Sequence, residues 1–198
     1  MDSVTLITRP RRFGKTLTIS MLERFFSIQY YNESAIFEHL DIWKYPEYRE
    51  IMGTYPAMER GLMTGITRVS KESLFSDFNN MEVVTTTSVK YADVYGFTED
   101  EVFSALDEYG LSDIKDKVKR WYDGFLFGNS KDIYNPWSII NLLDKKQLGT
   151  YWANTSANGL IAKLIQEGDR NIKQLFETLL KGESIVCEID EQIIYNQL

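Results

Sequence analysis

One stretch near the N-terminus constrains the fold more than any other. Val4–Thr8 is a short apolar, β-branched run, residues 9–13 form a basic segment, and Gly14-Lys15-Thr16 closes it at the start of an amphipathic stretch. Strand, loop, Gly-Lys-Thr and helix together are typical of a phosphate-binding loop, whose backbone N–H groups face an anion at a helix N-terminus. The pattern predicts that Lys15 reaches the outer phosphates of a nucleotide and that the Thr16 hydroxyl ligates Mg²⁺.

The match to the loop pattern G-x-x-x-x-G-K-T is incomplete. Its first glycine would fall on Arg9, which the following Pro10 restricts to extended conformations. Arg11 and Arg12 add positive charge that suits a phosphate group. A basic helix start that binds no ligand is the alternative, and the loop residues alone leave both interpretations open. If the loop binds phosphate, the site residues are Arg11, Arg12, Phe13, Gly14, Lys15 and Thr16, with the backbone of Phe13 and Gly14 donating.

The distribution of charge along the chain limits which kinds of binding partner are expected. The 198 residues carry a net charge of −7, yet residues 1–24 hold five basic and two acidic side chains, so their net charge is +3 and the rest of the chain carries −10. A local positive spot on an acidic body suits a small anion better than a long polyanion, so nucleic acid is not an expected partner. A second basic cluster is interrupted by acids and is interpreted as a solvated helix face: Lys115, Lys117, Lys119 and Arg120.

Cysteine and histidine content limits the chemistry further. The one cysteine, Cys187, excludes an internal disulfide and fits a reducing cytoplasm. The one histidine, His39, has no second histidine or cysteine nearby to complete a metal site, so we expect it at the surface. No signal peptide and no apolar run of the roughly 20 residues needed to cross a membrane is recognised. We therefore predict a cytoplasmic protein without membrane contact.

The pattern predicts an α/β first part. We expect a helix over residues 15–28, a short helix from Pro46 to Met52, and strands at residues 61–69 and 81–87. The expected apolar face of the first helix consists of Leu17, Met21, Phe25 and Ile28.

From Gly96 onward the signals are mainly helical. Three signals predict helix starts: a capping box at residues 98–101, Ser112, and Asn135 before Pro136. Between the last two, residues 125–134 predict a small hairpin. Further helices are expected near residues 157–166 and 170–181. The side chains expected on the buried faces are Val102, Phe103, Leu106, Ile114, Val118, Trp121, Trp137, Ile140 and Leu143. The chain would divide into a core at 1–95, a lid at 96–182 and a strand or linker at 183–198.

Seven segments carry specific motifs in a fixed order: residues 6–16, 62–73, 78–80, 95–98, 122–125, 134–138 and 151–156. Together they resemble the predicted AAA-ATPase-like proteins of bacteria, archaea and anaerobic eukaryotes, and the resemblance spans nearly the whole chain. In that family Arg9 belongs to the loop signature. The resemblance implies a reduced P-loop core of the ASCE type with a short parallel sheet, followed by a mainly helical lid. It also implies ATP and Mg²⁺ as cofactors and, in many members, a restriction-endonuclease-like nuclease domain.

The sequence departs from the family pattern. It begins directly at the first strand, it ends before a nuclease domain, and near position 57 it lacks a long stretch that holds two core strands and the Walker B acids. Those acids hold Mg²⁺ and position the attacking water, so we expect hydrolysis to be weak or absent. Residues 184–191 run from apolar to acidic but lie beyond the lid, and we do not expect them to substitute. The resemblance makes Arg68 a sensor-like candidate facing the terminal phosphate.

Loss of two strands has a structural consequence. The family's strand order implies that Val4–Thr8 lies between residues 62–67 and 83–87, all parallel, with the first helix as a right-handed crossover. The strand at 62–67 then becomes an exposed edge, and such edges pair with other chains. We predict self-association through this edge, or poor solubility.

Three functions follow from these observations. We expect ATP binding by a truncated P-loop domain with weak or absent hydrolysis. The first alternative is a non-catalytic protein–protein interaction module. The other is a regulatory fragment of a nuclease-associated ATPase, which the acidic charge and the lack of a nuclease domain disfavour.

Overall fold

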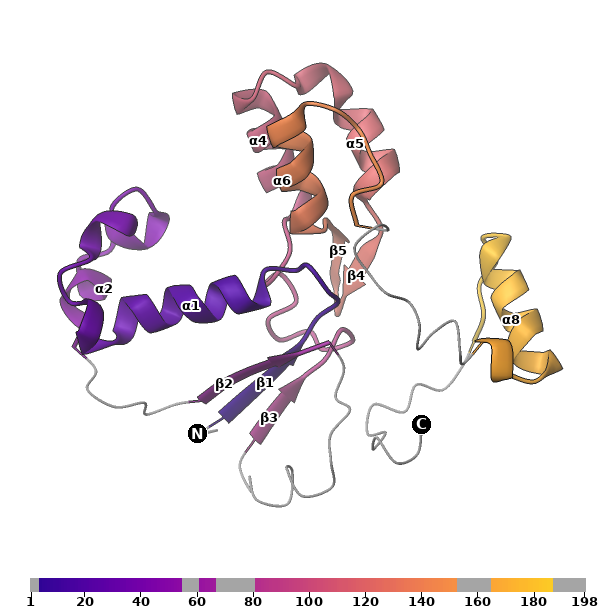
Figure 1. Ribbon diagram of the computed structural model, residues 1–198, viewed down its shortest axis with the longest axis horizontal. Coiled ribbons are helices and arrows are strands. Elements are labelled where there is room, and N and C mark those ends of the chain that lie inside the picture. The colour runs from indigo at the N-terminus through magenta and orange to yellow at the C-terminus, as the bar shows by residue number, and fades with distance from the viewer. Residues whose placement is uncertain (1–3, 55–60, 67–80, 153–164, 187–198) are drawn as a thin grey trace.

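The computed structural model describes residues 4–54, 61–66, 81–152 and 165–186. In the first part of the chain (Figure 1) the elements are β1 (Val4–Thr8), α1 (Lys15–Phe26), η1 (Ile28–Tyr30), η2 (Ser34–Ile36), η3 (Asp41–Lys44), α2 (Pro46–Ile51), β2 (Gly61–Gly65) and β3 (Met81–Val84), where η denotes a 3-10 helix. In the second part they are α4 (Glu99–Glu108), η4 (Ser112–Ile114), α5 (Lys115–Tyr122), β4 (Phe125–Phe127), β5 (Ser130–Ile133), α6 (Pro136–Lys145) and α8 (Arg170–Leu180).

The first three strands form one parallel sheet in the order β2-β1-β3, which confirms the predicted order. Val4 pairs with Gly61 on one side and with Met81 on the other. β1 is buried only toward its C-terminal end, from Leu6 to Thr8, where the chain enters the loop. The sheet therefore supports the loop directly.

β3 ends at Val84, three residues earlier than predicted. The Thr85 N–H donates to the Ser88 hydroxyl at 3.0 Å, and the Ser88 N–H donates to the Thr85 carbonyl at 3.3 Å. Hydroxyl side chains compete with strand pairing by bonding nearby backbone, and here they turn the chain out of the sheet. For β2, the predicted residues 67–69 lie outside the described residues.

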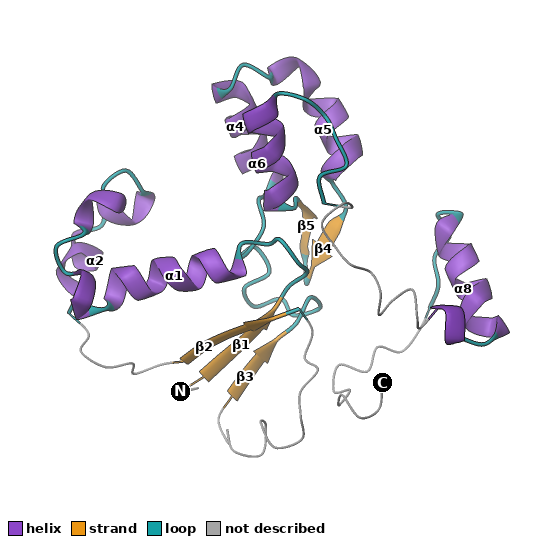
Figure 2. Ribbon diagram, viewed as in Figure 1, coloured by secondary structure: helices purple, strands orange, loops and turns teal. Residues whose placement is uncertain are grey.

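A buried cluster joins the sheet to the hairpin. The antiparallel pair β4-β5 confirms the predicted hairpin, and Figure 2 shows it at the end of the sheet from which the loop emerges. The cluster takes residues from β1, the loop, β3, the turn after it and the hairpin: Ile7, Phe13, Val84, Ala92, Tyr95, Phe127 and Ile133.

The helices α4, α5 and α6 enclose a second cluster. The predicted capping box is confirmed, since the Thr98 N–H donates to Glu101 Oε2 at 2.8 Å and the Glu101 N–H donates to Thr98 Oγ1 at 3.4 Å. The predicted Asn135 cap is confirmed too, with its Oδ1 accepting from the Ser138 N–H at 3.1 Å. The cluster consists of Val102, Leu106, Val118, Tyr122, Tyr134, Ile139 and Leu142.

Two predicted helix faces are wrong in part, and one predicted helix start is wrong. Val118 is buried as predicted, and Leu143 packs against the buried cluster. Trp121, Trp137 and Ile140 are exposed, and their sequence neighbours Tyr122 and Ile139 are buried instead. Both segments carry apolar residues on adjacent stripes, so periodicity alone does not decide which stripe faces the other helices. Ser112 does not cap α5, because residues 112–114 form the 3-10 turn η4 and α5 begins three residues later without a side-chain cap.

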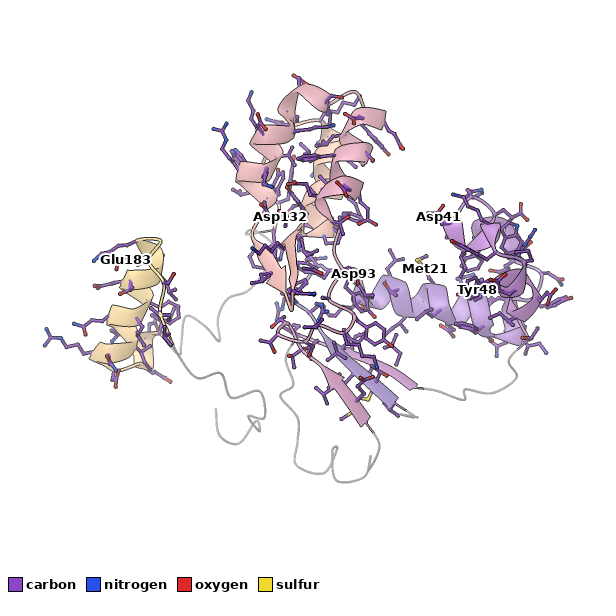
Figure 3. All side chains as sticks on the ribbon, turned by 180° about the vertical axis from the view of Figure 1, so that it is seen from behind. Met21, Asp41, Tyr48, Asp93, Asp132 and Glu183 are labelled. Carbon is purple, nitrogen blue, oxygen red and sulfur yellow. The ribbon has the colours of Figure 1, made fainter. Side chains whose placement is uncertain are left out.

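The expected apolar face of α1 is mostly uncovered. Phe25 is buried against Phe37 and Met52, whereas Leu17 is 63% exposed and Met21 is also exposed. Figure 3 shows Met21 on the side of α1 that faces away from the sheet. Ile28 lies beyond the helix end, in η1.

α8 matches the helix predicted for residues 170–181. Asp169 caps it by accepting from the Ile172 N–H at 2.9 Å, and Gly182 follows with a left-handed φ of 78°. Of the helix predicted for residues 157–166, only the end is described, and it is helical there. His39 is exposed as predicted, and Cys187 lies outside the described residues. Within the described ranges, no helix has the length and apolar character needed to cross a membrane.

Candidate functional site

The loop connects the C-terminal end of β1 to the first turn of α1 and has two left-handed residues. Arg12 has a φ of 68° and Gly14, the N-cap of α1, has a φ of 76°. A Cβ added at Gly14 would meet no atom within 4 Å, so the backbone angle rather than crowding requires glycine there.

The N-terminus of α1 has no side-chain cap. The first hydrogen bond of the helix runs from the Thr18 N–H to the Gly14 carbonyl at 2.9 Å, and no side chain caps the helix. In the described part of the chain, no acceptor takes the N–H groups of residues 13–17. Free N–H groups at a helix start carry the positive end of the helix dipole, which favours an anion.

Lys15 folds back across the loop. Its Nζ donates to the Arg9 carbonyl at 3.0 Å and to the Pro10 carbonyl at 2.7 Å. Burial lowers the pKa of Lys15, and the positive charge of Arg11 lowers it further. Among the residues that the structure describes, no carboxylate forms an ion pair or hydrogen bond with Lys15. The positive charges of Lys15 and Arg11 therefore lie close together in the loop, and a bound anion would offset their repulsion.

Arg9 is a structural residue. Its side chain is fully buried, and its guanidinium donates to the Thr8 carbonyl at 2.8 Å, to the Thr85 carbonyl at 2.9 Å and to the Tyr91 carbonyl at 2.6 Å. The guanidinium also lies 4.7 Å from the ring centre of Phe127. Burial lowers the pKa of Arg9. Arg9 thus ties the loop to the segment that follows β3 and to the hairpin, and it is not available to a ligand.

Phe13 anchors the loop by packing against the hairpin. Its side chain is buried, with ring centres 4.9 Å from Phe125 and 5.4 Å from Phe127. A Cβ at Gly96 would lie 2.4 Å from Ile133 Cγ2 and 3.3 Å from the Phe13 ring, so glycine is needed for this close approach. Of Phe13, only the backbone can serve a ligand.

Residues of the second part of the chain hold the loop from the other side. The Arg11 carbonyl accepts from Asn135 Nδ2 at 3.3 Å and from Trp152 Nε1 at 3.2 Å. The Arg12 guanidinium lies 4.7 Å from the ring centre of Trp137. No sequence pattern indicates these contacts, because the partners lie more than a hundred positions apart in the chain. Asn135 therefore both caps α6 and positions the loop.

The remaining predicted site residues differ in accessibility. Thr16 is exposed on the first turn of α1, and its hydroxyl has no hydrogen-bond partner in the described ranges. The Arg11 side chain is exposed as well. Arg68 lies outside the described residues, so its sensor-like role stays a prediction.

A second polar cluster lies between α4, α5 and the hairpin, and the sequence does not predict it. One carboxylate oxygen from each of Glu99, Asp123 and Asp132 lies within 4.8 Å of the others; Asp132 projects from the hairpin (Figure 3). Lys119 Nζ lies 2.5 Å from Glu99 Oε2 and 3.5 Å from Asp132 Oδ2, and the Tyr134 hydroxyl donates to Glu99 at 3.1 Å. Burial, followed by the neighbouring Asp132, raises the pKa of Asp123. Because a lysine ammonium already lies among the acids, we interpret the cluster as a partly exposed ion network that joins α4, α5 and the hairpin.

Comparison with known proteins places this loop in a family. Residues 1–123, more than half of the chain, match the family described as "Predicted AAA-ATPase". The chain is also 30% identical over 108 residues to "Uncharacterized protein in vnfD 5'region" of Azotobacter chroococcum mcd 1. That match covers 54% of this chain and 20% of the relative, so the chain matches about a fifth of that protein's length. No solved structure matches. The chain belongs to the predicted AAA-ATPase family.

Proposed function

We propose that the chain binds a nucleoside triphosphate, ATP in the first instance, as a truncated P-loop domain with weak or absent hydrolysis. One observation carries the proposal: the free N–H groups at the start of α1 lie beside Lys15 and Arg11, two cations that no described carboxylate neutralises. Family membership supports the same conclusion.

Each loop residue has a distinct role in this proposal. The N–H groups of Gly14 and its neighbours would donate to phosphate oxygens at the positive end of α1. Lys15 would exchange its two carbonyl acceptors, Arg9 and Pro10, for the outer phosphates. Arg11 has an exposed side chain next to Lys15 and would add charge. Arg12 would shape the loop through its left-handed backbone and its stack on Trp137.

Magnesium fits the site in part. The exposed Thr16 hydroxyl on the first turn is the type of oxygen ligand that Mg²⁺ takes together with phosphate oxygens and waters. Bound there, Mg²⁺ would neutralise phosphate charge. In the part of the chain that the structure describes, no carboxylate bonds Thr16, so the described residues offer no second protein ligand for Mg²⁺ beside it. This is why we propose binding rather than turnover.

Thermal unfolding with and without Mg-ATP tests the proposal. At a ligand concentration of about one hundred times Kd, binding adds about 2.7 kcal/mol to the free energy of unfolding, which raises Tm by roughly 5–10 °C for a chain of this size. Lys15→Ala should lose that rise. Lys44→Ala removes a lysine from η3, far from the loop in sequence, and should keep it. An unchanged Tm for the natural sequence at millimolar Mg-ATP would refute nucleotide binding.

The second candidate function is protein–protein interaction. It is favoured by the apolar side of α8, whose Ile172, Leu175, Phe176 and Leu179 are all exposed and recur at helical spacing. If Mg-ATP leaves the Tm unchanged, this function becomes the better account.

A further inference from the structure

A cavity of about 220 Å³ opens beside the loop, between the end of α5, the hairpin and the start of α6. Half of its ten lining residues are aromatic. The residues that matter to the argument are Trp121, Tyr122, Phe125, Asn135, Tyr151 and Trp152.

The cavity and the loop share a wall. Asn135 and Trp152 line the cavity, and both donate to the Arg11 carbonyl, at 3.3 and 3.2 Å. Phe125, also in the lining, has its ring centre 6.1 Å from that of Trp152 and 4.9 Å from that of Phe13. A molecule whose phosphates lie on the loop therefore has the cavity directly alongside.

Hydrogen bonds fix the far wall. The Tyr122 hydroxyl donates to the Gly149 carbonyl and accepts from the Gly149 N–H, each at 2.9 Å. The Tyr151 hydroxyl donates to the Gln147 carbonyl at 2.7 Å. Pre-formed walls lower the entropy that is lost on binding.

Two indole rings give the cavity its chemical character. Trp121 is 51% exposed and Trp152 is 37% exposed, although both are large aromatic side chains. Exposed aromatic faces bind flat rings by stacking, and nucleobases bind in this way regardless of sequence.

Size restricts the occupant to one ring system. Ligand pockets for drug-sized molecules span roughly 300–1,000 Å³, more than is available here. An apolar cavity of about 150 Å³ holds benzene. The present volume therefore suits a fused pair of rings better than a whole nucleotide.

We propose that this cavity receives the purine base of the nucleotide whose phosphates bind the loop. The proposal rests on the proposed function, and it adds the site that distinguishes a nucleotide from a bare polyphosphate.

Trp121 is the residue to change. Its only ring contact in the described part of the chain is with Tyr122, at 6.2 Å between ring centres, and its exposure means that truncation removes little packing. Trp152 is less suitable, because its indole N–H holds the loop. Tyr109→Ala is the matched control, since Tyr109 is similarly exposed but lies at the end of α4 and does not line the cavity.

Isothermal titration with Mg-ATP and with Mg-tripolyphosphate, which has no base, tests the inference. Trp121→Ala should weaken Mg-ATP binding roughly tenfold and leave tripolyphosphate binding unchanged. Trp121→Phe should keep most of the natural affinity for Mg-ATP, because an aromatic ring remains. Tyr109→Ala should bind both ligands like the natural sequence.

The outcomes separate the two proposals. If tripolyphosphate binds but Trp121→Ala leaves Mg-ATP affinity intact, the cavity is not the base site and the proposed function stands. Equal affinity for Mg-CTP and Mg-ATP would overturn the purine assignment. If neither Mg-ATP nor tripolyphosphate binds the natural sequence, both proposals fail.

Discussion

At the scale of single residues, Arg9 shows how a side chain that departs from a motif can hold the motif in place. A phosphate loop usually has glycine at this position. Here the buried guanidinium donates to the carbonyl of the preceding Thr8 and to those of Thr85 and Tyr91, which lie in the segment after β3. The side chain that fills the glycine position thus fixes the loop's entry point.

Arg9→Lys should therefore destabilise the fold. Lysine carries one ammonium in place of a planar fork, and it would leave at least one buried carbonyl without a donor. We expect the free energy of unfolding to fall by about 2 kcal/mol in urea denaturation. The same exchange at exposed Arg11 should change it by no more than about 0.5 kcal/mol. Equal effects at the two positions would show that the hydrogen bonds of Arg9 do not stabilise the fold.

The pH dependence of anion binding should report Lys15. The pKa of Lys15 in the folded chain lies below its ordinary value of 10.5, so the folded chain releases this proton at lower pH than the unfolded chain does. As pH rises toward 10.5, the contribution of Lys15 to stability therefore increases, whereas its attraction for an anion decreases.

Titration with tripolyphosphate at increasing pH measures the second effect. Affinity should begin to fall before the pH at which an ordinary lysine loses its proton. Lys15→Met should bind weakly and lack this fall. An affinity that stays constant up to the ordinary pKa would contradict the assignment of Lys15.

At the scale of elements, the close contact between hairpin and loop depends on Gly96. Its φ of 118° and the 2.4 Å separation of an added Cβ from Ile133 Cγ2 both oppose a side chain. Gly110 also has a positive φ, of 71°, but a Cβ there would meet no atom within 4 Å.

Gly96→Ala should cost more than Gly110→Ala for this reason. We expect the difference in the free energy of unfolding to be about 2 kcal/mol, the usual range for overpacking. Chemical denaturation of both variants gives the comparison. If the two substitutions cost the same, backbone angle alone matters and the hairpin does not pack tightly on Phe13.

What the sequence predicts well is local. The strand, loop and helix at residues 4–26, the Thr98 capping box and the Asn135 cap each depend on residues a few positions apart, and the structure has all three. The contacts that shape the site are not local: Arg9 bonds Tyr91 from 82 positions away and Trp152 bonds Arg11 from 141. Trp121 and Ile140 are exposed although periodicity predicts them on buried faces. Each helix has two adjacent apolar stripes, and only packing against the other helices decides which one is buried.

At the scale of the whole molecule, β2 and β3 are the edges of the three-strand sheet among the residues that the structure describes. Unpaired edges present N–H and C=O groups to other chains. Self-association through β2 and the residues after it, residues 62–67, therefore stays a prediction of this account, and so does the division into core and lid near position 95.

Sedimentation velocity over a range of concentrations tests self-association. The average mass should rise above that of the monomer as concentration increases. Ile66→Lys, next to β2 and 47% exposed, should oppose the rise, because lysine at a strand edge disfavours pairing. Leu126→Lys on β4, exposed to a similar degree, should not. A constant monomer mass at high concentration would rule out association through this edge.

The central claim is that the start of α1 binds phosphate, and amide NMR tests it most directly. On addition of Mg-ATP, the backbone N–H resonances of Gly14, Lys15 and Thr16 should shift and their exchange with solvent should slow, because each N–H gains an acceptor. In Lys15→Ala the corresponding resonances should stay in place at the same ligand concentration. Unchanged loop resonances in the natural sequence, with or without shifts elsewhere in the chain, would contradict the account.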